Sequence, residues 1–317
     1  MRAIYALCHP RKPGLLDHAR AVVRYGRLYD PAATYRLMTG LGDVRSLHRG
    51  AVVVVWDNSP KSLALAWICR FRGATIVYYL HEPGGLGQKL VKDDPLVYSF
   101  MAAYAELSFR GVAHLVAVPR YDRMAHGDVF LPLPFWEERP PPVAGARRIG
   151  FVGARRHHRL QHVFASLEPV IRAEGFEPAY FPAPGGGAGE AEKFAFLSEC
   201  AAVWNPYGVP LNQSGVTLDA AMSSIPVIGT AFEPFRELLQ PLGLFYELSL
   251  SAGPEHLAEQ VRAILRYLAA KNDRKPVDAA ARSELAGAAM FQRRWLPFFQ
   301  TLQSRSDATN LPSASAT

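Results

Sequence analysis

Residues 203–238 read VWNPYGVPLNQSGVTLDAAMSSIPVIGTAFEPFREL, and this stretch gives the clearest indication of the fold class. It starts at the end of an apolar run and continues through a polar turn that contains Ser-Gly. A helical pattern of small residues follows over 216–223, and a second apolar run occupies 226–229. A strand, a helix and a further strand in this order indicate a βαβ unit with parallel strands.

Apolar runs and helical patterns alternate in the same way on both sides of this unit. The predicted strands are 3–7, 51–56, 75–80, 114–118, 148–152, 178–181, 201–204 and 226–229. The predicted helices are 61–71, 95–110, 216–223, 257–270 and 285–302. The series predicts an α/β fold of two Rossmann-like, doubly wound domains, with ligands bound outside the carboxyl ends of the strands and facing a cleft between the domains.

A proline-rich stretch divides the two series of strands. Five prolines lie between Pro132 and Pro142, and neither a helix nor a central strand accommodates them. We therefore expect an N-terminal domain over 1–135, a linker over 136–146 and a C-terminal domain over 147–303. The polar, small-residue tail over 304–317 is predicted to be disordered.

Composition sets the broad class of the protein. Apolar residues make up 49% of the 317 residues and charged residues 20%, which is typical of a globular protein and excludes disorder for the bulk of the chain. No apolar run has the length of a membrane span, and the N-terminus does not resemble a signal peptide. The cysteines Cys8, Cys69 and Cys200 form no CxxC pair, which disfavours a disulfide framework and suits the cytoplasm.

The excess of positive charge lies in the first half of the chain. Residues 1–146 hold 18 basic and 12 acidic side chains, whereas residues 147–317 hold 17 and 16. A basic face attracts phosphates or an anionic membrane surface, although a merely solvated basic surface is an equal alternative. No basic run interleaved with aromatic residues and no zinc-finger spacing occurs, so nucleic acid is not an expected partner.

Residues 203–238 resemble the nucleotide-sugar-binding half of GT-B glycosyltransferases, especially the group 1, or family 4, type. The helix of that family reads Leu-Glu-Ala-hydrophobic-small and precedes Gly-x-Pro-Val; here LDAAM (218–222) and IPVI (225–228) take those places. IGFVG (149–153) and YYLHEP (78–83) are weaker similarities. The resemblance implies a nucleotide-diphosphate sugar as donor substrate, and a C-terminal helix that can return to the first domain. It makes 147–303 the nucleotide-sugar-binding domain and 1–135 the acceptor-side domain.

The turn before the small-residue helix is the candidate phosphate site. Amides at a helix N-terminus point outward without partners, and the helix dipole adds positive charge there. Ser214, Gly215, Val216 and Thr217 can therefore hold a diphosphate, with glycine permitting close approach. An ordinary Ser/Thr cap without a ligand is the alternative.

The resemblance also implies residues that contact the rest of the donor. Asp219 takes the place of the family's second conserved glutamate, which accepts hydrogen bonds from ribose hydroxyls, although aspartate is shorter. The family's first glutamate stands eight residues earlier, where this chain has Leu211. Asn212 or Gln213 can contact the donor instead without supplying negative charge, and Tyr207 in the preceding turn joins the donor-binding set.

Arg155, Arg156 and Arg159 follow the strand RIGFV, where a ligand crevice is expected. Departure of a nucleoside diphosphate leaves negative charge, and guanidinium groups suit its stabilisation in GT-B enzymes, which generally have no essential metal. A solvated basic loop is the alternative for each arginine.

A metal site and a cofactor are not expected. His157, His158 and His162 have a spacing that a metal could use, but no acid or cysteine lies near them in sequence. The same spacing fits the exposed start of a helix. The nucleotide-diphosphate sugar is expected as the donor substrate and not as a cofactor.

His81 and Glu82 follow the strand TIVYYL and are the candidate catalytic pair. Either can deprotonate an acceptor hydroxyl or contact the transferred sugar, and a capping role for the Gly-rich loop is the alternative. Asp17 and His18 are weaker candidates. Glu233 and Glu237 follow PVIGT and are both expected near the donor, although Glu237 fits a first-turn helix acid equally well.

Together these features predict a glycosyltransferase of hexosyltransferase type. It would move a sugar to a hydroxyl of a glycan or a lipid-linked acceptor, in the synthesis of cell-surface polysaccharide or glycoconjugates, at the inner membrane face. A UDP-sugar epimerase or hydrolase on the same fold is one alternative. A non-catalytic GT-B-like binding protein is the other, and the missing acid at Leu211 supports it.

Overall fold

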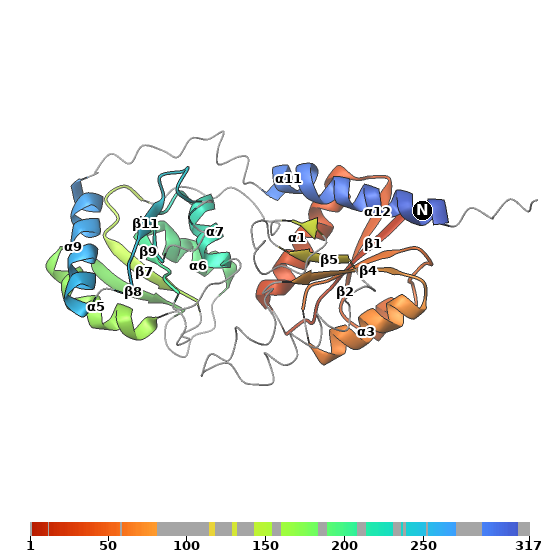
Figure 1. Cartoon of the computed structure of the whole chain (residues 1–317), viewed down its shortest axis with the longest axis horizontal. Helices are drawn as coiled ribbons and strands as arrows, with labels where there is room; N and C mark the ends of the chain where they lie inside the picture. The colour runs from red at the N-terminus through yellow and green to blue at the C-terminus, as the bar shows by residue number, and fades with distance from the viewer. Residues whose placement is uncertain are drawn as a thin grey trace, which may run out of the picture. The chain divides into compact units, whose positions relative to one another are not determined.

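The computed structural model describes residues 2–11, 13–57, 59–80, 114–117, 129–131, 143–153, 160–182, 189–207, 214–230, 236, 239–251, 253–270 and 287–309. These residues fall into two units (Figure 1). The first takes its described residues from 2–131 and 287–309, and the second from 143–270. Each unit has one parallel sheet with helices packed on it, so the predicted α/β fold of two Rossmann-like units is confirmed.

The sheet of the first unit has the strand order β2-β1-β3-β4-β5-β6, and all the pairings are parallel. Its strands are β1 (Arg2–Leu7), β2 (Ala33–Met38), β3 (Val52–Val55), β4 (Thr75–Leu80), β5 (His114–Ala117) and β6 (Val129–Phe130). The four valines of β3 are all buried, because helices cover both faces of the sheet at this central strand.

Two groups of helices cover this sheet (Figure 1). Helices α2 (Leu41–Val44) and α3 (Pro60–Phe71) lie on one face, where Leu63, Ala66 and Cys69 are buried. Ser59 caps α3 by accepting a hydrogen bond from the amide of Ser62 at 3.3 Å, with proline at the first helical position. Helix α1 (Pro13–Tyr29) lies on the other face.

The C-terminal segment packs beside α1 on the sheet of the first unit. It consists of α11 (Gly287–Met290), a π-helical turn η3 (Phe291–Trp295) and α12 (Leu296–Thr309). The π turn was not predicted; Pro297 lacks an amide hydrogen and crowds the carbonyl four residues earlier, which favours a widened turn just before it. Helix α12 continues to Thr309, beyond the predicted start of a disordered tail, because no proline or glycine follows until Pro312.

The sheet of the second unit has the order β11-β10-β9-β7-β8 and is also parallel. Its strands are β7 (Arg148–Val152), β8 (Glu177–Phe181), β9 (Cys200–Trp204), β10 (Val227–Gly229) and β11 (Phe245–Glu247). Helices α5 (Gln161–Ala173) and α9 (Pro254–Ala270) cover one face, and α6 (Glu190–Ser198) and α7 (Gly215–Met222) cover the other (Figure 1). β9 lies at the centre of this sheet, and all five of its residues are buried.

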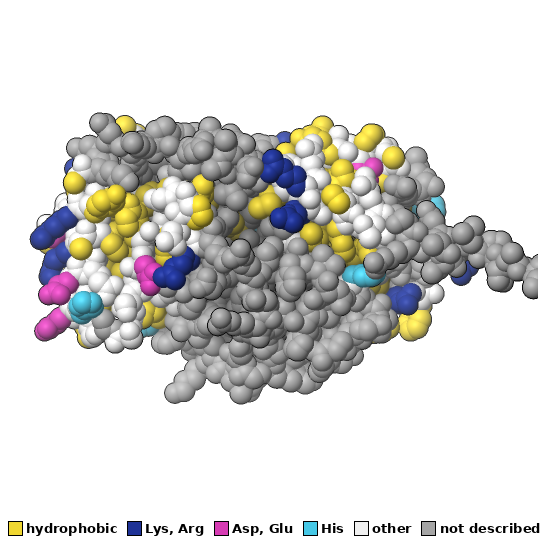
Figure 2. All heavy atoms as spheres, turned by 45° about the horizontal axis from the view of Figure 1, so that its top comes forward, with side chains coloured by type: hydrophobic (Ala, Val, Ile, Leu, Met, Phe, Trp, Pro, Cys, Tyr) yellow, Lys and Arg dark blue, Asp and Glu magenta, His cyan; other side chains and the backbone are white. Residues whose placement is uncertain are grey.

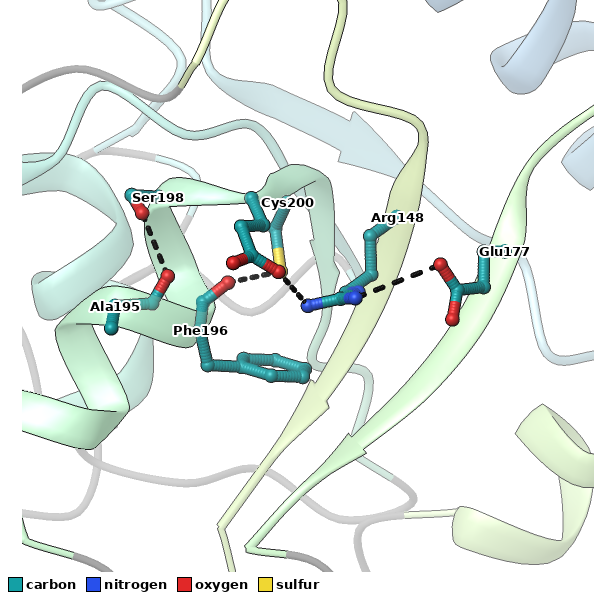
Figure 3. Close-up of polar contacts among 7 residues, drawn as sticks. Arg148, Glu177, Ala195, Phe196, Ser198 and Cys200 are labelled. Carbon is teal, nitrogen blue, oxygen red and sulfur yellow. Dashed lines mark hydrogen bonds and ion pairs between the residues drawn. The ribbon is translucent and has the colours of Figure 1, made fainter.

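A polar cluster joins the amino ends of three strands in the second unit (Figure 3). Arg148, the first residue of β7, forms ion pairs with Glu199 and with Glu177 at 3.7 Å, and its guanidinium lies over the Phe196 ring. Ligands of open α/β sheets bind at the carboxyl ends of the strands. This cluster therefore stabilises the edge of the sheet opposite to the candidate site.

Among the described residues, no helix combines the length and the apolar character that are needed to cross a bilayer.

Candidate functional site

The N-terminus of α7 lies just beyond the central strand β9 and is exposed at its first residue. Ser214 is the cap, and its hydroxyl accepts a hydrogen bond from the amide of Thr217 at 3.4 Å. A Cβ atom added to Gly215 would meet nothing within 4 Å. Within the described residues, the amides of Gly215 and Val216 have no hydrogen-bond partner, so they remain available to an anion.

Asn205 fixes this helix end from inside the protein. It follows β9 directly, is 1% exposed, and donates from its amide nitrogen to the hydroxyls of Ser214 at 3.0 Å and Thr217 at 2.6 Å. Thr217 is fully buried, so its hydroxyl serves this network rather than a ligand. Buried hydrogen bonds of this kind hold the exposed amides of α7 in one orientation.

Tyr207 connects the same network to the next strand. Its hydroxyl donates to the Ser214 hydroxyl at 3.0 Å, and its backbone amide donates to the Thr230 hydroxyl at 3.1 Å. The Thr230 hydroxyl donates in turn to the Tyr207 carbonyl at 3.1 Å. Thr230 follows β10, so the loops at the carboxyl ends of β9 and β10 are tied together beside the N-terminus of α7.

Asp219 forms an ion pair that sequence reasoning did not anticipate. Its carboxylate lies 2.8 Å from the ammonium of Lys193, which extends from α6. Both side chains are about one quarter exposed, at 21% for Asp219 and 27% for Lys193. A ribose hydroxyl that reaches Asp219 would therefore share this carboxylate with Lys193.

Several predicted site residues lie outside the described residues. They are Arg155, Arg156, Arg159, Asn212, Gln213, Glu233, His81 and Glu82. The described elements next to them are known: β7 precedes the three arginines, and β4 ends immediately before His81. Their proposed roles remain predictions. Of the predicted set, the structure brings together Tyr207, Ser214 and Thr217 in one hydrogen-bond network.

The carboxyl end of the first sheet carries a separate polar cluster around Asp57, which follows β3. Its carboxylate is 2% exposed and accepts from the amides of His9 at 2.7 Å and Ser59 at 2.9 Å, and from the Ser62 hydroxyl at 2.8 Å. These contacts hold the loop after β1 against the start of α3. Asp57 is thus a positioning residue for this end of the sheet.

The weaker catalytic candidates occupy α1. Asp17 forms an ion pair with Arg20 at 3.3 Å, and the His18 ring lies 6.2 Å from the Trp56 ring, centroid to centroid. Both residues are near the carboxyl end of β1, because α1 begins a few residues after that strand.

Sequence reasoning missed Asn205, Lys193 and Asp57. Asn205 and Asp57 share one signal, since each is a polar residue that directly follows a buried tryptophan at the end of β9 or just after β3. Such positions project from the carboxyl edge of a parallel sheet, where ligands bind. Lys193 gives no comparable signal, because it meets Asp219 only through the packing of α6 beside α7.

The described residues offer neither a metal cluster nor an activated thiol. No group of three or more His, Cys, Asp or Glu side chains within this part of the chain is arranged to hold a metal ion. The cysteines Cys8, Cys69 and Cys200 are buried, and none of them forms a disulfide bond. Burial raises the pKa of the Cys69 thiol to about 11, against the opposing effect of Arg72, so this thiol stays protonated at neutral pH.

Comparison with solved structures identifies the fold. A sucrose-phosphate synthase from Thermosynechococcus elongatus matches 97% of this chain and 100% of its own, with a TM-score of 0.65 and 12% identity. HepE from Anabaena, in complex with UDP and glucose, matches over 97% and 98%, with a TM-score of 0.57 and 14% identity. The pneumococcal O-GlcNAc transferase GtfA, in complex with UDP and GlcNAc, gives a TM-score of 0.60 at 8% identity.

These matches show that the chain has the fold of GT-B glycosyltransferases, as the resemblance in residues 203–238 predicted. No protein-family model matches the sequence, and no curated protein matches it. The chain spans only about 60% of the GtfA/B, TarM and pneumococcal GtfA chains, at 60%, 58% and 59%, whereas it spans the whole of the sucrose-phosphate synthase.

Proposed function

We propose that the protein is a glycosyltransferase that moves a sugar from a nucleotide-diphosphate donor to a hydroxyl of a glycan or lipid-linked acceptor. One observation carries this proposal: two amides without a hydrogen-bond partner among the described residues stand at the exposed N-terminus of α7, in a position fixed by Asn205. Solved proteins of the same fold hold UDP and sugars. The second unit would bind the donor, and the basic first half of the chain would bind the acceptor.

The reaction requires charge stabilisation at the departing diphosphate. The bond between the anomeric carbon and the diphosphate oxygen breaks, and the amides of Gly215 and Val216 stabilise the charge that forms on the phosphate. The arginines after β7 would add to this effect. The acceptor oxygen bonds to the anomeric carbon while its proton passes to a base, for which His81 or Glu82 is our candidate.

The remaining parts of the proposal concern substrate and location. A ribose contact with Asp219 would explain why an acid lies on the otherwise apolar helix α7.

The cytoplasmic side of a membrane, where lipid-linked acceptors of cell-surface polysaccharide synthesis are exposed, suits the positive charge of residues 1–146. The near balance of residues 147–317 agrees with Figure 2, where acidic and basic side chains of the second unit lie close together.

A thermal-shift panel tests the donor. We expect one of UDP, GDP, ADP or CMP, or its sugar conjugate, to raise the melting temperature selectively, since a ligand at about 100 times its Kd adds about 2.7 kcal/mol to the folded state. Sugar transfer that depends on an added acceptor separates a transferase from an epimerase or hydrolase. Failure of every nucleotide to raise the melting temperature would favour a non-catalytic binding protein.

A further inference from the structure

Helix α3 exposes an apolar patch that does not pack in the core. Its inward residues Leu63, Ala66 and Cys69 are buried against the sheet, whereas Ile68 is 38% exposed and Phe71 is 84% exposed. Ile68 and Phe71 are three positions apart, so they lie on the same outward face of the helix. Single exposed apolar residues are common, but two neighbours on the last turns of one helix form a patch.

Trp67 extends this patch toward the sheet. Its ring is 6.0 Å from the Phe71 ring, centroid to centroid, and it is half-buried against the core. An amphipathic tryptophan beside an exposed phenylalanine is typical of helices that lie at the boundary between water and lipid.

Basic side chains surround the patch. Arg70 and Arg72 flank Phe71 and are exposed, and within the described residues neither forms an ion pair. Arg49 is exposed as well, and it reaches the end of α3: a Cβ on Gly73 would lie 3.0 Å from the Arg49 Cγ. Arg45 adds a fourth guanidinium on the segment that packs beside α3.

Within residues 39–57 and 59–74, which the structure describes, no acidic side chain is exposed to balance these charges. Residues 39–74 hold five basic side chains and two acidic ones, Asp43 and Asp57. Asp57 is buried with three hydrogen-bond donors around it, and Asp43 accepts hydrogen bonds from the amides of Thr39 and Gly40. This part of the first unit therefore exposes apolar and positively charged side chains without an exposed acid of its own.

We infer that the C-terminal half of α3, with Trp67, Ile68 and Phe71 as apolar anchors and Arg49, Arg70 and Arg72 as cations, docks on an anionic lipid surface. The inference rests on the proposed membrane association and assigns it to one face of the first unit. A lipid surface matches both properties, because acyl chains accept the apolar side chains while lipid phosphates pair with the guanidinium groups. Docking on the lipid surface requires neither the nucleotide-sugar donor nor the acceptor substrate.

Vesicle co-sedimentation of the full chain tests this assignment. We expect binding to vesicles of phosphatidylcholine with phosphatidylglycerol, weak binding to phosphatidylcholine alone, and loss of binding at about 1 M salt, where the screening length falls to about 3 Å. Replacing both Arg70 and Arg72 by glutamine should weaken binding about thirtyfold. Each arginine near an anionic lipid surface contributes about 1 kcal/mol, and about 1.4 kcal/mol corresponds to a tenfold change in affinity. The Ile68→Ser/Phe71→Ser variant should weaken it about tenfold or more.

Matched controls lie elsewhere on the first unit. Leu28→Ser removes a side chain that is 63% exposed on α1, and Arg36→Gln removes an exposed charge on the edge strand β2; both should bind vesicles as the wild type does.

Equal binding of wild type and α3 variants would overturn the assignment. So would a wild-type dimer that dissociates on the Ile68→Ser/Phe71→Ser change while vesicle binding is kept, since the patch would then join two copies. The nucleotide-induced thermal shift of each variant reports the donor site separately.

Discussion

Replacement of Trp295 by alanine should lower the free energy of unfolding of the first unit by about 3–5 kcal/mol, the usual cost of removing a large buried aromatic side chain. Trp295 is fully buried, and its ring lies 5.5 Å from Trp56, 5.8 Å from Tyr79 and 5.7 Å from Phe299, centroid to centroid. Trp56 directly follows β3 and Tyr79 belongs to β4, whereas Trp295 belongs to the C-terminal segment. The cavity would therefore weaken the packing of the C-terminal segment on the sheet.

Hydrogen exchange followed by mass spectrometry measures this effect locally. Amides of β1 and β3 should exchange faster in the Trp295→Ala variant, whereas those of β7 and β9 in the second unit should keep their wild-type rates. Trp295→Phe should lose less stability because part of the ring contact remains, and the exposed Leu28→Ala change should stay within about 0.5 kcal/mol. Unchanged exchange in β1 and β3 would show that the C-terminal segment does not stabilise this sheet.

Replacement of Asn205 by alanine should lower the free energy of unfolding of the second unit by about 1–3 kcal/mol and also weaken nucleotide binding. The change leaves the buried hydroxyls of Ser214 and Thr217 without their shared donor, and an unsatisfied buried polar group costs this much. The amides of α7 would then lose their fixed orientation. Urea unfolding measures the first effect, and calorimetric titration with UDP measures the second.

A double-mutant cycle that combines Asn205→Ala with Thr217→Val tests whether Asn205 stabilises the second unit through the cap of α7. Because the Asn205 amide and the Thr217 hydroxyl are 2.6 Å apart, the two changes should not be additive, and residues in direct contact typically show coupling of about 0.5–3 kcal/mol. Strictly additive losses would mean that Asn205 stabilises the unit by a route other than the cap of α7.

Much of the fold could be predicted because both units are parallel α/β layers with buried strands. β3 and β9 are continuous apolar runs, and each stands out in the sequence for that reason. β2 was missed because it is an edge strand: ATYRLM alternates polar and apolar residues, and Arg36 is exposed. The π turn before Pro297 was missed because helical periodicity alone does not distinguish a widened turn from an α-helix.

Only those parts of the candidate site that are formed by residues close together in the sequence could be predicted. The cap at Ser214 and the start of α7 follow from a serine placed just before a helical pattern. The hydrogen bonds from Asn205 and the ion pair of Lys193 with Asp219 depend on tertiary packing, and no spacing in the sequence indicates them. The resemblance pointed to Asp219, but it did not indicate that a lysine already occupies one side of its carboxylate.

The proposed donor site depends on the N-terminal amides of α7, which we expect to bind the diphosphate. Gly215 makes it possible to remove a single amide hydrogen, because it is the first helical residue, where proline is tolerated, and its Cβ would meet no atom within 4 Å. Ser214 has φ −106° and ψ 122°, a conformation that a residue before proline can adopt. Gly215→Ala keeps the amide hydrogen and adds the same first carbon, so it is the matched control.

The decisive measurement is therefore the Kd of UDP for Gly215→Pro against that for Gly215→Ala, by isothermal titration calorimetry. Loss of one hydrogen bond to a charged phosphate, worth about 1.5–3 kcal/mol, predicts at least about tenfold weaker binding to the proline variant, with uridine binding equal in the two. Equal affinities for UDP in two variants that both remain folded would contradict the account and place the diphosphate elsewhere.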